Sequence, residues 1–492
     1  MSKRALFYSL FKKHNFILTL VLITFFFKGV FLAALFPIFK GQDESRHYNS
    51  IQYLNEPAEK NWNIIKKPSE PYSEDRKIKF YTYNFSEEIR KTAQSTNSEA
   101  VFTPEDYDRM NFSDGFLGKN ENEITDKKWD PYNKIYPPDI AGKSLYHKTV
   151  ALIDKALYRE NILIRYFSIR IFSVFLGMLC ILLAYLIAKN IGLTSKQSLL
   201  IAAIISFHPK FSIYLTNINY DAFLIPSFFA FTLAGVSILG KGLNWKNGLI
   251  ISTSLMIALF TKGTGVILFP VFFGLIMFHS YEIKKSKRFK TYLASSTILL
   301  IVLFLIFNSQ YKISGLISVS PYTNKSSSEI IVSLEKYLSK TFLKITSPHA
   351  DYWGDIDWVR NDYSEHLINI IWFAQIVALI GLVMFLFRKH KPDFLPEKKY
   401  VVFLFGIWFV LQFGIRFFDW KYSLSDPDLD VGTSGRYFLP AITSHIILIF
   451  TGLGMILKKE KYLDIALKIG LILIFIFFMH VIFNTIIPQF YL

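Results

Sequence analysis

The chain has 492 residues, of which 52% are hydrophobic and 19% are charged, and its mean hydropathy is +0.30. Repeated apolar runs of membrane-spanning length predict an all-α polytopic membrane protein and exclude an outer-membrane barrel, whose strands alternate. The formal net charge of +17 comes mostly from predicted loops on one side of the membrane, as the positive-inside rule describes, so no nucleic-acid partner is expected. The single cysteine, Cys180, excludes an intramolecular disulfide.

The first span is predicted at about residues 15–37. The basic residues before it place the N-terminus in the cytoplasm, and no small-residue cleavage site follows it, so we expect the span to be retained. Residues 38–165 then form a long polar segment, the first extracytoplasmic loop region. A helical spacing of apolar residues at 151–158 indicates one interfacial helix within it.

The rest of the chain alternates apolar runs with short basic turns. Residues 247–278 are too long for one span and short for two, so two helices of about 14 residues should meet at Lys262, shorter than the bilayer core. Helices this short are tolerated where they line a cavity. The total is about 11 transmembrane helices in a single domain, 1–492. The other spans are predicted near residues 167–188, 198–215 (interrupted at His208-Pro209), 222–239, 292–307, 367–387, 401–417, 437–457 and 462–487.

This topology gathers the polar segments on the outer face of the membrane. The first loop region, a second extracytoplasmic loop at 309–366, the segment 419–436 and the tip at Lys262 all lie there, and the C-terminus is external. The sequence contains no Walker-type loop and no dinucleotide fingerprint, so an ATP-driven pump is not expected. An enzyme on the outer face would therefore need an activated substrate that is carried by a lipid.

Two adjacent carboxylates, Asp43 and Glu44, follow the first span, with Arg46 and His47 beside them. Acids at the mouth of a membrane helix are costly unless they are solvated or used. In one interpretation they act as a general base, or bind a divalent cation that contacts a departing phosphate. In the other they only mark the end of the span and are solvated by water. His47 would share a helical face with Asp43, but one acid and one histidine form a weak metal motif.

Two cations near apolar sequence are candidate phosphate ligands. Lys262, in T-K-G-T-G, would neutralise a lipid-linked phosphate or extend to the headgroups. Arg436, which precedes Tyr437 in G-R-Y-F-L-P, has the fork geometry for a bidentate phosphate contact.

Three other charged residues and one tryptophan allow two interpretations each. We interpret Asp221 mainly as the N-terminal acid of its helix rather than as a catalytic residue, and Arg165 and Arg170 mainly as interfacial anchors rather than phosphate ligands. Trp353, in Y-W-G, offers an aromatic face to a sugar or to the membrane interface.

Three motifs together resemble a family of bacterial multi-span membrane proteins known as domain of unknown function 2142, which is grouped with the GT-C glycosyltransferases. They are D-E-x-x-H after the first span, Y-W-G-x-x-x-W in the second outer loop, and G-R-Y-F-L-P. The resemblance implies a GT-C-like membrane fold, a polyprenyl-phosphate sugar donor and an outward-facing site in which Asp43 is the base or metal ligand. The chain departs from the family at 136–139, which reads Y-P-P-D, and at 355–357, which lacks the usual glycine.

We therefore predict an integral membrane glycosyltransferase that moves a sugar, with inversion, from a polyprenyl phosphate to a cell-envelope glycan or lipid. A transporter or flippase of lipid-linked saccharides, or a non-catalytic subunit of envelope-polymer assembly, is the alternative. A transporter should carry ionisable groups near mid-membrane on several spans, whereas most spans predicted here carry none. The predicted catalytic residues are Asp43 and Glu44, with Asp43 also the candidate cation ligand, and the predicted substrate contacts are Arg46, His47, Lys262, Arg436, Tyr437 and Trp353.

Overall fold

The computed structural model describes residues 13–41, 43–55, 88–89, 92, 144–283, 333–338, 351–354, 365–425 and 434–491. Every regular element in these ranges is a helix, and seven of the helices are long and apolar enough to cross a membrane. The protein is thus a polytopic all-α membrane protein, as predicted. The span expected at 292–307 lies outside the described residues, so the total of eleven stays a prediction.

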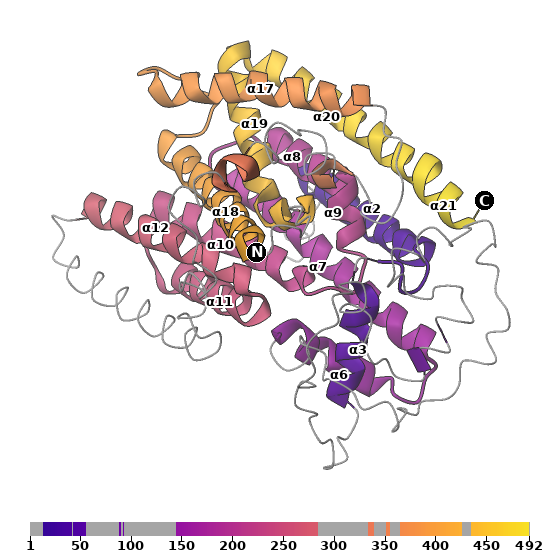
Figure 1. Ribbon diagram of the computed structural model, residues 1–492. Helices are drawn as coiled ribbons and strands as arrows, with labels where there is room; N and C mark the ends of the chain where they lie inside the picture. Colours follow the sequence, from indigo (N-terminus) through magenta and orange to yellow (C-terminus); the bar gives the residue numbers. More distant parts are fainter. Residues whose placement is uncertain are drawn as a thin grey trace, which may run out of the picture.

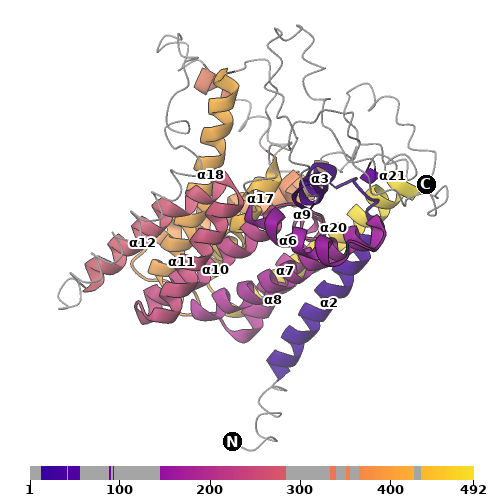
Figure 2. The same cartoon turned by 90° about the horizontal axis from the view of Figure 1, so that it is seen from below.

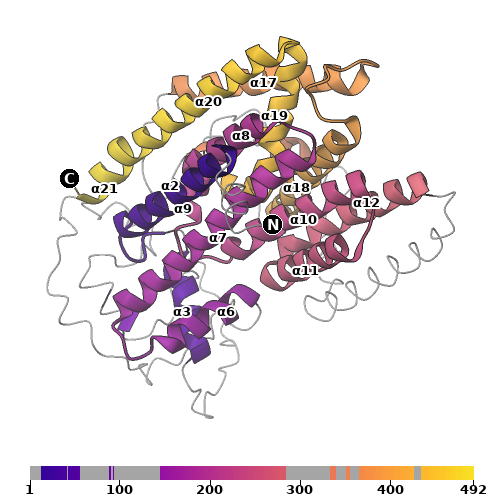
Figure 3. The same ribbon diagram turned by 180° about the vertical axis from the view of Figure 1, so that it is seen from behind.

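The first part of the bundle is built from α2 (Lys13–Leu35) and α7 (Ile162–Asn190), which pack against each other. Two shorter helices, α3 (Glu44–Asn55) and α6 (Leu145–Ala156), pack together beside the start of α7. Figures 1 and 3 show this pair on one side of the bundle, next to α7. The span predicted at 167–188 begins five residues earlier than expected, because the Asn161 side chain caps α7 by accepting from the amide of Ile164.

The predicted interruption at His208-Pro209 is present. Helix α8 (Ser195–Phe207) ends there and α9 (Pro209–Tyr214) begins with the proline in its first turn. A partly buried lysine that the sequence analysis did not single out, Lys28 of α2, satisfies groups at this break: it donates to the Ser206 carbonyl and, at 2.8 Å, to the Ser212 hydroxyl. The break is therefore a fixed bend in the chain.

The paired short helices are also confirmed. Helix α10 (Asp221–Lys241) is followed by α11 (Trp245–Thr261), then by a 3-10 turn, η3 (Gly263–Ile267), and by α12 (Leu268–Ile283). Lys262 lies at the junction. The 17 residues of α11 extend over about 25 Å, slightly more than predicted but still less than a 30 Å hydrocarbon core.

The last part of the chain adds α17 (Glu365–Phe387), α18 (Lys398–Ser425), η4 (Gly435–Ala441), α19 (Ile442–Leu457), α20 (Glu460–Val481), η5 (Ile482–Ile486) and α21 (Ile487–Tyr491). Helices α17 and α19 are in close backbone contact, because Gly381 and Gly452 have no Cβ that would overlap the facing chain.

The end of α2 and the start of η4 lie at the same end of the bundle. The 3-10 turn η4 contacts α9, α10 and α18. Figure 2 shows α3 and α9 near the end of α2 that is remote from the N-terminus. The side of the membrane that this end faces stays a prediction.

Candidate functional site

Asp43 and Arg436 meet at this end of the bundle. An Asp43 carboxylate oxygen lies 3.2 Å from Arg436 Nη2, and the other lies 3.7 Å from Arg46. Asp43 has a positive φ of 55°, a conformation that asparagine and aspartate tolerate better than most residues. Its side chain remains 31% exposed, so one predicted catalytic carboxylate is accessible from outside the protein.

The guanidinium of Arg436 is held by aromatic hydroxyls as well as by Asp43. Its Nη1 donates to the Tyr214 hydroxyl and its Nη2 donates, at 3.2 Å, to the Tyr437 hydroxyl. The Arg436 side chain is buried, and its Nε has no hydrogen-bond partner among the described residues. A buried donor without a partner is costly, so the guanidinium retains capacity for an acceptor such as a phosphate oxygen.

Lys262 belongs to the same cluster. Its Nζ lies 3.0 Å from a carboxylate oxygen of Asp221 and 4.4 and 4.6 Å from the ring centroids of Tyr220 and Tyr437. Arg436 lies 5.0 Å from the Tyr437 ring, so one aromatic ring contacts both cations. Asp221 begins α10, as predicted, but it also pairs with Lys262.

Glu44 points away from Asp43 and into the protein. Its carboxylate is fully buried and accepts four hydrogen bonds: from the amides of Gly41 (3.0 Å) and Ile218 (2.8 Å) and from Arg170 Nε (2.8 Å) and Nη2 (2.7 Å). A Cβ on Gly41 would overlap this carboxylate. The geometry gives Glu44 a structural position rather than the predicted catalytic one.

The two arginines of α7 are not interfacial anchors, and this corrects the sequence interpretation. Arg170 is fully buried and, besides pairing with Glu44, donates to the carbonyls of Ala33 and Phe36 at the end of α2. Arg165 is also buried, and it pairs with Glu88 and, at 3.0 Å, with Asp154. Both arginines therefore fasten the segments around Asp43 to α7, because an unpaired buried charge would be strongly destabilising.

His47 contacts a histidine that the sequence analysis missed. The rings of His47 and His147 stack 5.1 Å apart, with Nδ1 of His47 2.9 Å from Nε2 of His147, and Tyr220 lies edge-on to His47 at 4.7 Å. Burial, reinforced by Arg436, Lys262 and Arg46, lowers the pKa of His47 to about 3. Burial also lowers the pKa of His147, and His47 adds to this effect. Both rings are therefore neutral at physiological pH.

Trp353 contacts a second cluster. Its ring lies 4.9 Å from His208 and 6.2 Å from His445, and it is buried. Sequence reasoning grouped Trp353 with Asp43, but these neighbours place it beside the break between α8 and α9. Tyr214, Tyr220 and His147 are the residues near Asp43 that sequence reasoning missed. Tyr220 lies in a short polar turn, Tyr214 near the end of a predicted span and His147 in the long first loop region, and none of these positions identifies a site.

The predicted divalent cation at Asp43 does not fit the side chains around it. The carboxylate faces two guanidinium groups, and its neighbour Glu44 is committed to Arg170. Within the described ranges, no group of three or more His, Cys, Asp or Glu side chains could hold a metal ion.

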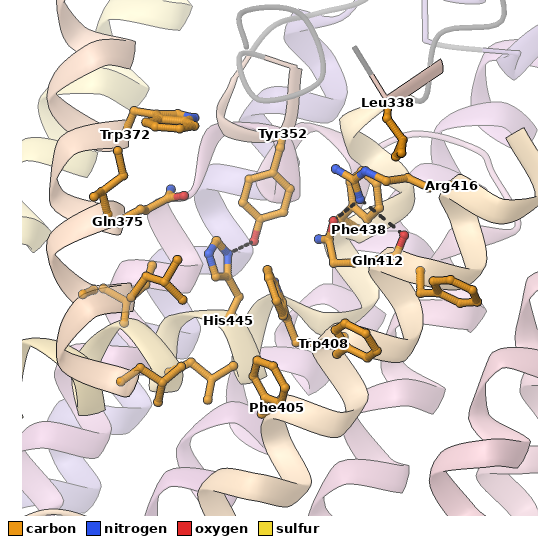
Figure 4. Close-up of a pocket in the computed structure, with 18 of the residues that line it drawn as sticks. Leu338, Tyr352, Trp372, Gln375, Phe405, Trp408, Gln412, Arg416, Phe438 and His445 are labelled. Carbon is orange, nitrogen blue, oxygen red and sulfur yellow. Dashed lines mark hydrogen bonds between the residues drawn. The ribbon is translucent and has the colours of Figure 1, made fainter. Parts of the chain in front are cut away.

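An apolar pocket lies next to η4. Its volume is about 820 Å³, and its lining combines aromatic side chains, most of them from α18, with aliphatic side chains of α17 and α19 (Figure 4). Its polar groups include Gln375 and Gln412. Tyr352 and His445 share a hydrogen bond of 2.9 Å, and the Arg416 guanidinium lies 4.6 Å from the Phe438 ring. Because Phe438 lines the pocket, η4 contributes both to this pocket and to the Asp43 cluster.

One comparison with known proteins bears on this site. Residues 164–307 match the family model of dolichyl-phosphate-mannose-protein mannosyltransferases, a GT-C type. The match covers less than a third of the chain and includes Lys262, whereas Asp43 and Arg436 lie outside it. No curated protein matches the chain. The match supports the GT-C class of membrane glycosyltransferases, and the narrower resemblance to domain of unknown function 2142 stays a prediction.

Proposed function

We propose that the protein is a GT-C-type glycosyltransferase, of the family called domain of unknown function 2142, that uses a polyprenyl-phosphate sugar on the outer face of the cell membrane. The acceptor would be a cell-envelope glycan or lipid. The observation that carries this proposal is the meeting of one accessible carboxylate, Asp43, with two cations, Arg436 and Lys262, which come from three distant parts of the chain.

In the proposed reaction, Asp43 is the general base. It accepts the proton of an acceptor hydroxyl while that oxygen bonds to the anomeric carbon of the sugar. The bond between the anomeric carbon and the phosphate oxygen breaks, its electron pair stays on the phosphate, and polyprenyl phosphate leaves. Attack and departure occur on opposite faces of the sugar, so the configuration inverts.

The two cations would stabilise the charge that develops on the departing phosphate. Arg436 is paired with Asp43 before the reaction. When Asp43 takes up a proton it becomes neutral, and the guanidinium loses its anionic partner as the phosphate gains charge. The pairing therefore directs Arg436 to the phosphate at the moment when the phosphate needs it.

The apolar pocket is the proposed site for the polyprenyl chain of the donor. Its aromatic lining suits a long isoprenoid, because apolar and aromatic walls with few polar groups characterise such sites. Its volume of about 820 Å³ falls within the range of ligand pockets. Phe438 lines it only two residues after Arg436, which suits a donor whose phosphate and lipid chain are directly joined.

Lys28 is the charged group within α2 that a transporter hypothesis would use. It is committed to the Ser206 carbonyl and the Ser212 hydroxyl, and it is surrounded by the rings of Phe25, Phe207 and Phe478. A lysine that satisfies a helix break does not need to line a path. The contacts of Lys28 thus favour the enzyme over the flippase.

The test compares three strains that carry the gene for wild-type protein, Asp43→Asn or Asp464→Asn in a deletion background. Asp464 is the matched control, because it pairs with Lys196 at the start of α8, remote from Asp43. Mass spectrometry of envelope glycans and lipid-linked sugars should show that Asp43→Asn resembles the deletion and accumulates the donor. A wild-type profile in that strain would remove Asp43 from the mechanism.

A further inference from the structure

The start of η4 is anchored by a carboxylate that belongs to the second outer loop. One oxygen of Asp351 accepts hydrogen bonds from the backbone amide of Gly435 and, at 2.7 Å, from the hydroxyl of Ser434. These two residues directly precede Arg436. Asp351 thus fixes the backbone from which the Arg436 side chain extends toward Asp43.

The other oxygen of Asp351 pairs with Lys210 of α9, and the two side chains are only 7% and 3% exposed. A buried pair of this kind has a defined geometry, because each partner would be an uncompensated charge without the other. Helix α9 also carries Tyr214, whose hydroxyl accepts from Arg436 Nη1. One short helix therefore holds Arg436 at two points, through its preceding backbone and through its guanidinium.

Helix α9 is itself firmly placed. Its N-cap is His208, whose Nδ1 accepts from the amide of Phe211 at 3.3 Å, and Lys28 donates to the Ser212 hydroxyl. The His208 ring packs against Trp353, two residues after Asp351. The bend at Pro209 and the segment 351–354 therefore form one packed unit behind Arg436.

We propose that Asp351 and Lys210 are positioning residues that hold Arg436 in reach of Asp43 and of the donor phosphate. Neither touches the reacting atoms: Asp351 acts through the Gly435 amide, and Lys210 acts through Asp351. This inference rests on the proposed function. It assigns to the buried Asp351–Lys210 pair a role in placing Arg436, in addition to any contribution to stability. Misplacing a catalytic group by about 1 Å can lower a rate about 100-fold.

The first test measures transfer by the full-length protein in lipid nanodiscs, with polyprenyl-phosphate sugars extracted from the deletion strain as donor. The variants are Asp351→Asn, the doubly neutral Asp351→Leu/Lys210→Met, which also removes the acceptor of the Gly435 amide, and the conservative Lys210→Arg. For Asp351→Asn and the double variant we expect kcat to fall about 10- to 100-fold while KM for the donor changes far less. The double variant leaves no buried unpaired charge, so it should fold even if Asp351→Asn does not. Lys210→Arg should retain most of the rate.

A second readout does not depend on activity. Asp43→Cys and Arg436→Cys are introduced together and treated with a bifunctional thiol cross-linker, since the single native cysteine, Cys180, is buried. Adding Asp351→Leu/Lys210→Met should lower the yield of cross-linked protein severalfold. Unchanged cross-linking, or an unchanged kcat in a folded double variant, would overturn the positioning role, as would a failure of all three variants to fold. If the wild type transfers no sugar but cross-linking falls as expected, the positioning stands and the proposed function fails.

Discussion

Glu44 and Arg170 lie 126 residues apart in the chain and meet fully buried, through Nε–Oε1 and Nη2–Oε2 contacts of 2.8 and 2.7 Å. Arg170 also binds carbonyls at the end of α2, where the helix leaves its last backbone acceptors without partners. The pair therefore closes α2 and fixes the turn in which Asp43 lies. The residue next to the proposed base holds the site in place, and the proposed base itself stays accessible.

This division of roles predicts opposite effects for the two neighbouring acids. Glu44→Gln leaves the Arg170 guanidinium buried without its anion, which should cost about 3–5 kcal/mol of unfolding free energy. Asp43→Asn should cost much less, because its carboxylate is partly exposed. A thiol-reactive dye that reports the exposure of Cys180 on heating provides the measurement.

The matched control for Glu44→Gln is the double variant Glu44→Gln/Arg170→Met, in which neither position carries a charge and part of the stability should return. If Glu44→Gln keeps the wild-type unfolding temperature and still abolishes transfer, Glu44 is catalytic after all and the structural assignment is wrong.

The cation pair predicts losses in transition-state binding. Arg436→Met and Lys262→Met should each lower kcat/KM for the donor about 100-fold or more, because each removes a preorganised charge from the departing phosphate. Arg436→Lys should recover little, since lysine lacks the planar fork that contacts Tyr214, Tyr437 and Asp43 together.

Steady-state transfer rates at varied donor concentration measure these losses. Lys196→Met is the control, because this lysine is exposed and pairs with Asp464 at the other end of the helices. Equal losses in the control and at Lys262 would indicate a general electrostatic effect instead of a phosphate site.

The buried histidine pair predicts a dependence of stability on pH. In the folded protein the pKa of His47 is lowered to about 3, whereas in the unfolded chain it is about 6.5. Between these values the unfolded state binds more protons, so stability falls as the pH drops below about 6.5 and is constant above it. The loss is at most about 1.4 kcal/mol per pH unit for each histidine.

Unfolding temperatures at pH 7 and pH 5 measure this slope. His147→Gln, which retains a polar side chain, should reduce the difference between the two temperatures, although it also lowers both. A slope that is the same in wild type and variant would show that other groups cause the loss at low pH.

The pocket predicts a dependence on the length of the donor lipid. Leu379→Trp replaces a leucine of α17 in the pocket lining by a larger, aromatic side chain. It should raise KM several-fold for a long-chain donor but not for a short-chain analogue. Ile380→Trp is the matched control, since Ile380 is equally exposed on the same helix but does not line the pocket. If both variants behave alike with both donors, the polyprenyl chain does not enter this pocket.

Much of the membrane architecture could be predicted from the sequence because its causes are local. The apolar run of α2, the bend at His208-Pro209 and the short helices that meet at Lys262 depend on hydropathy, on a proline and on glycines within a few residues. The motifs also selected Asp43, Arg436 and Tyr437, three residues that the structure brings together.

The roles of the neighbouring residues were decided by the tertiary structure. Whether Glu44 faces the site or the interior depends on Arg170, and whether Arg436 is held depends on Asp351 and Lys210. These partners lie more than 80 residues apart in the chain. The apolar pattern of a span predicts that it crosses a membrane, because hydropathy can be read along the chain. It does not predict which buried charge of another segment the span will contact, because an ion pair depends on which side chains lie close together in space.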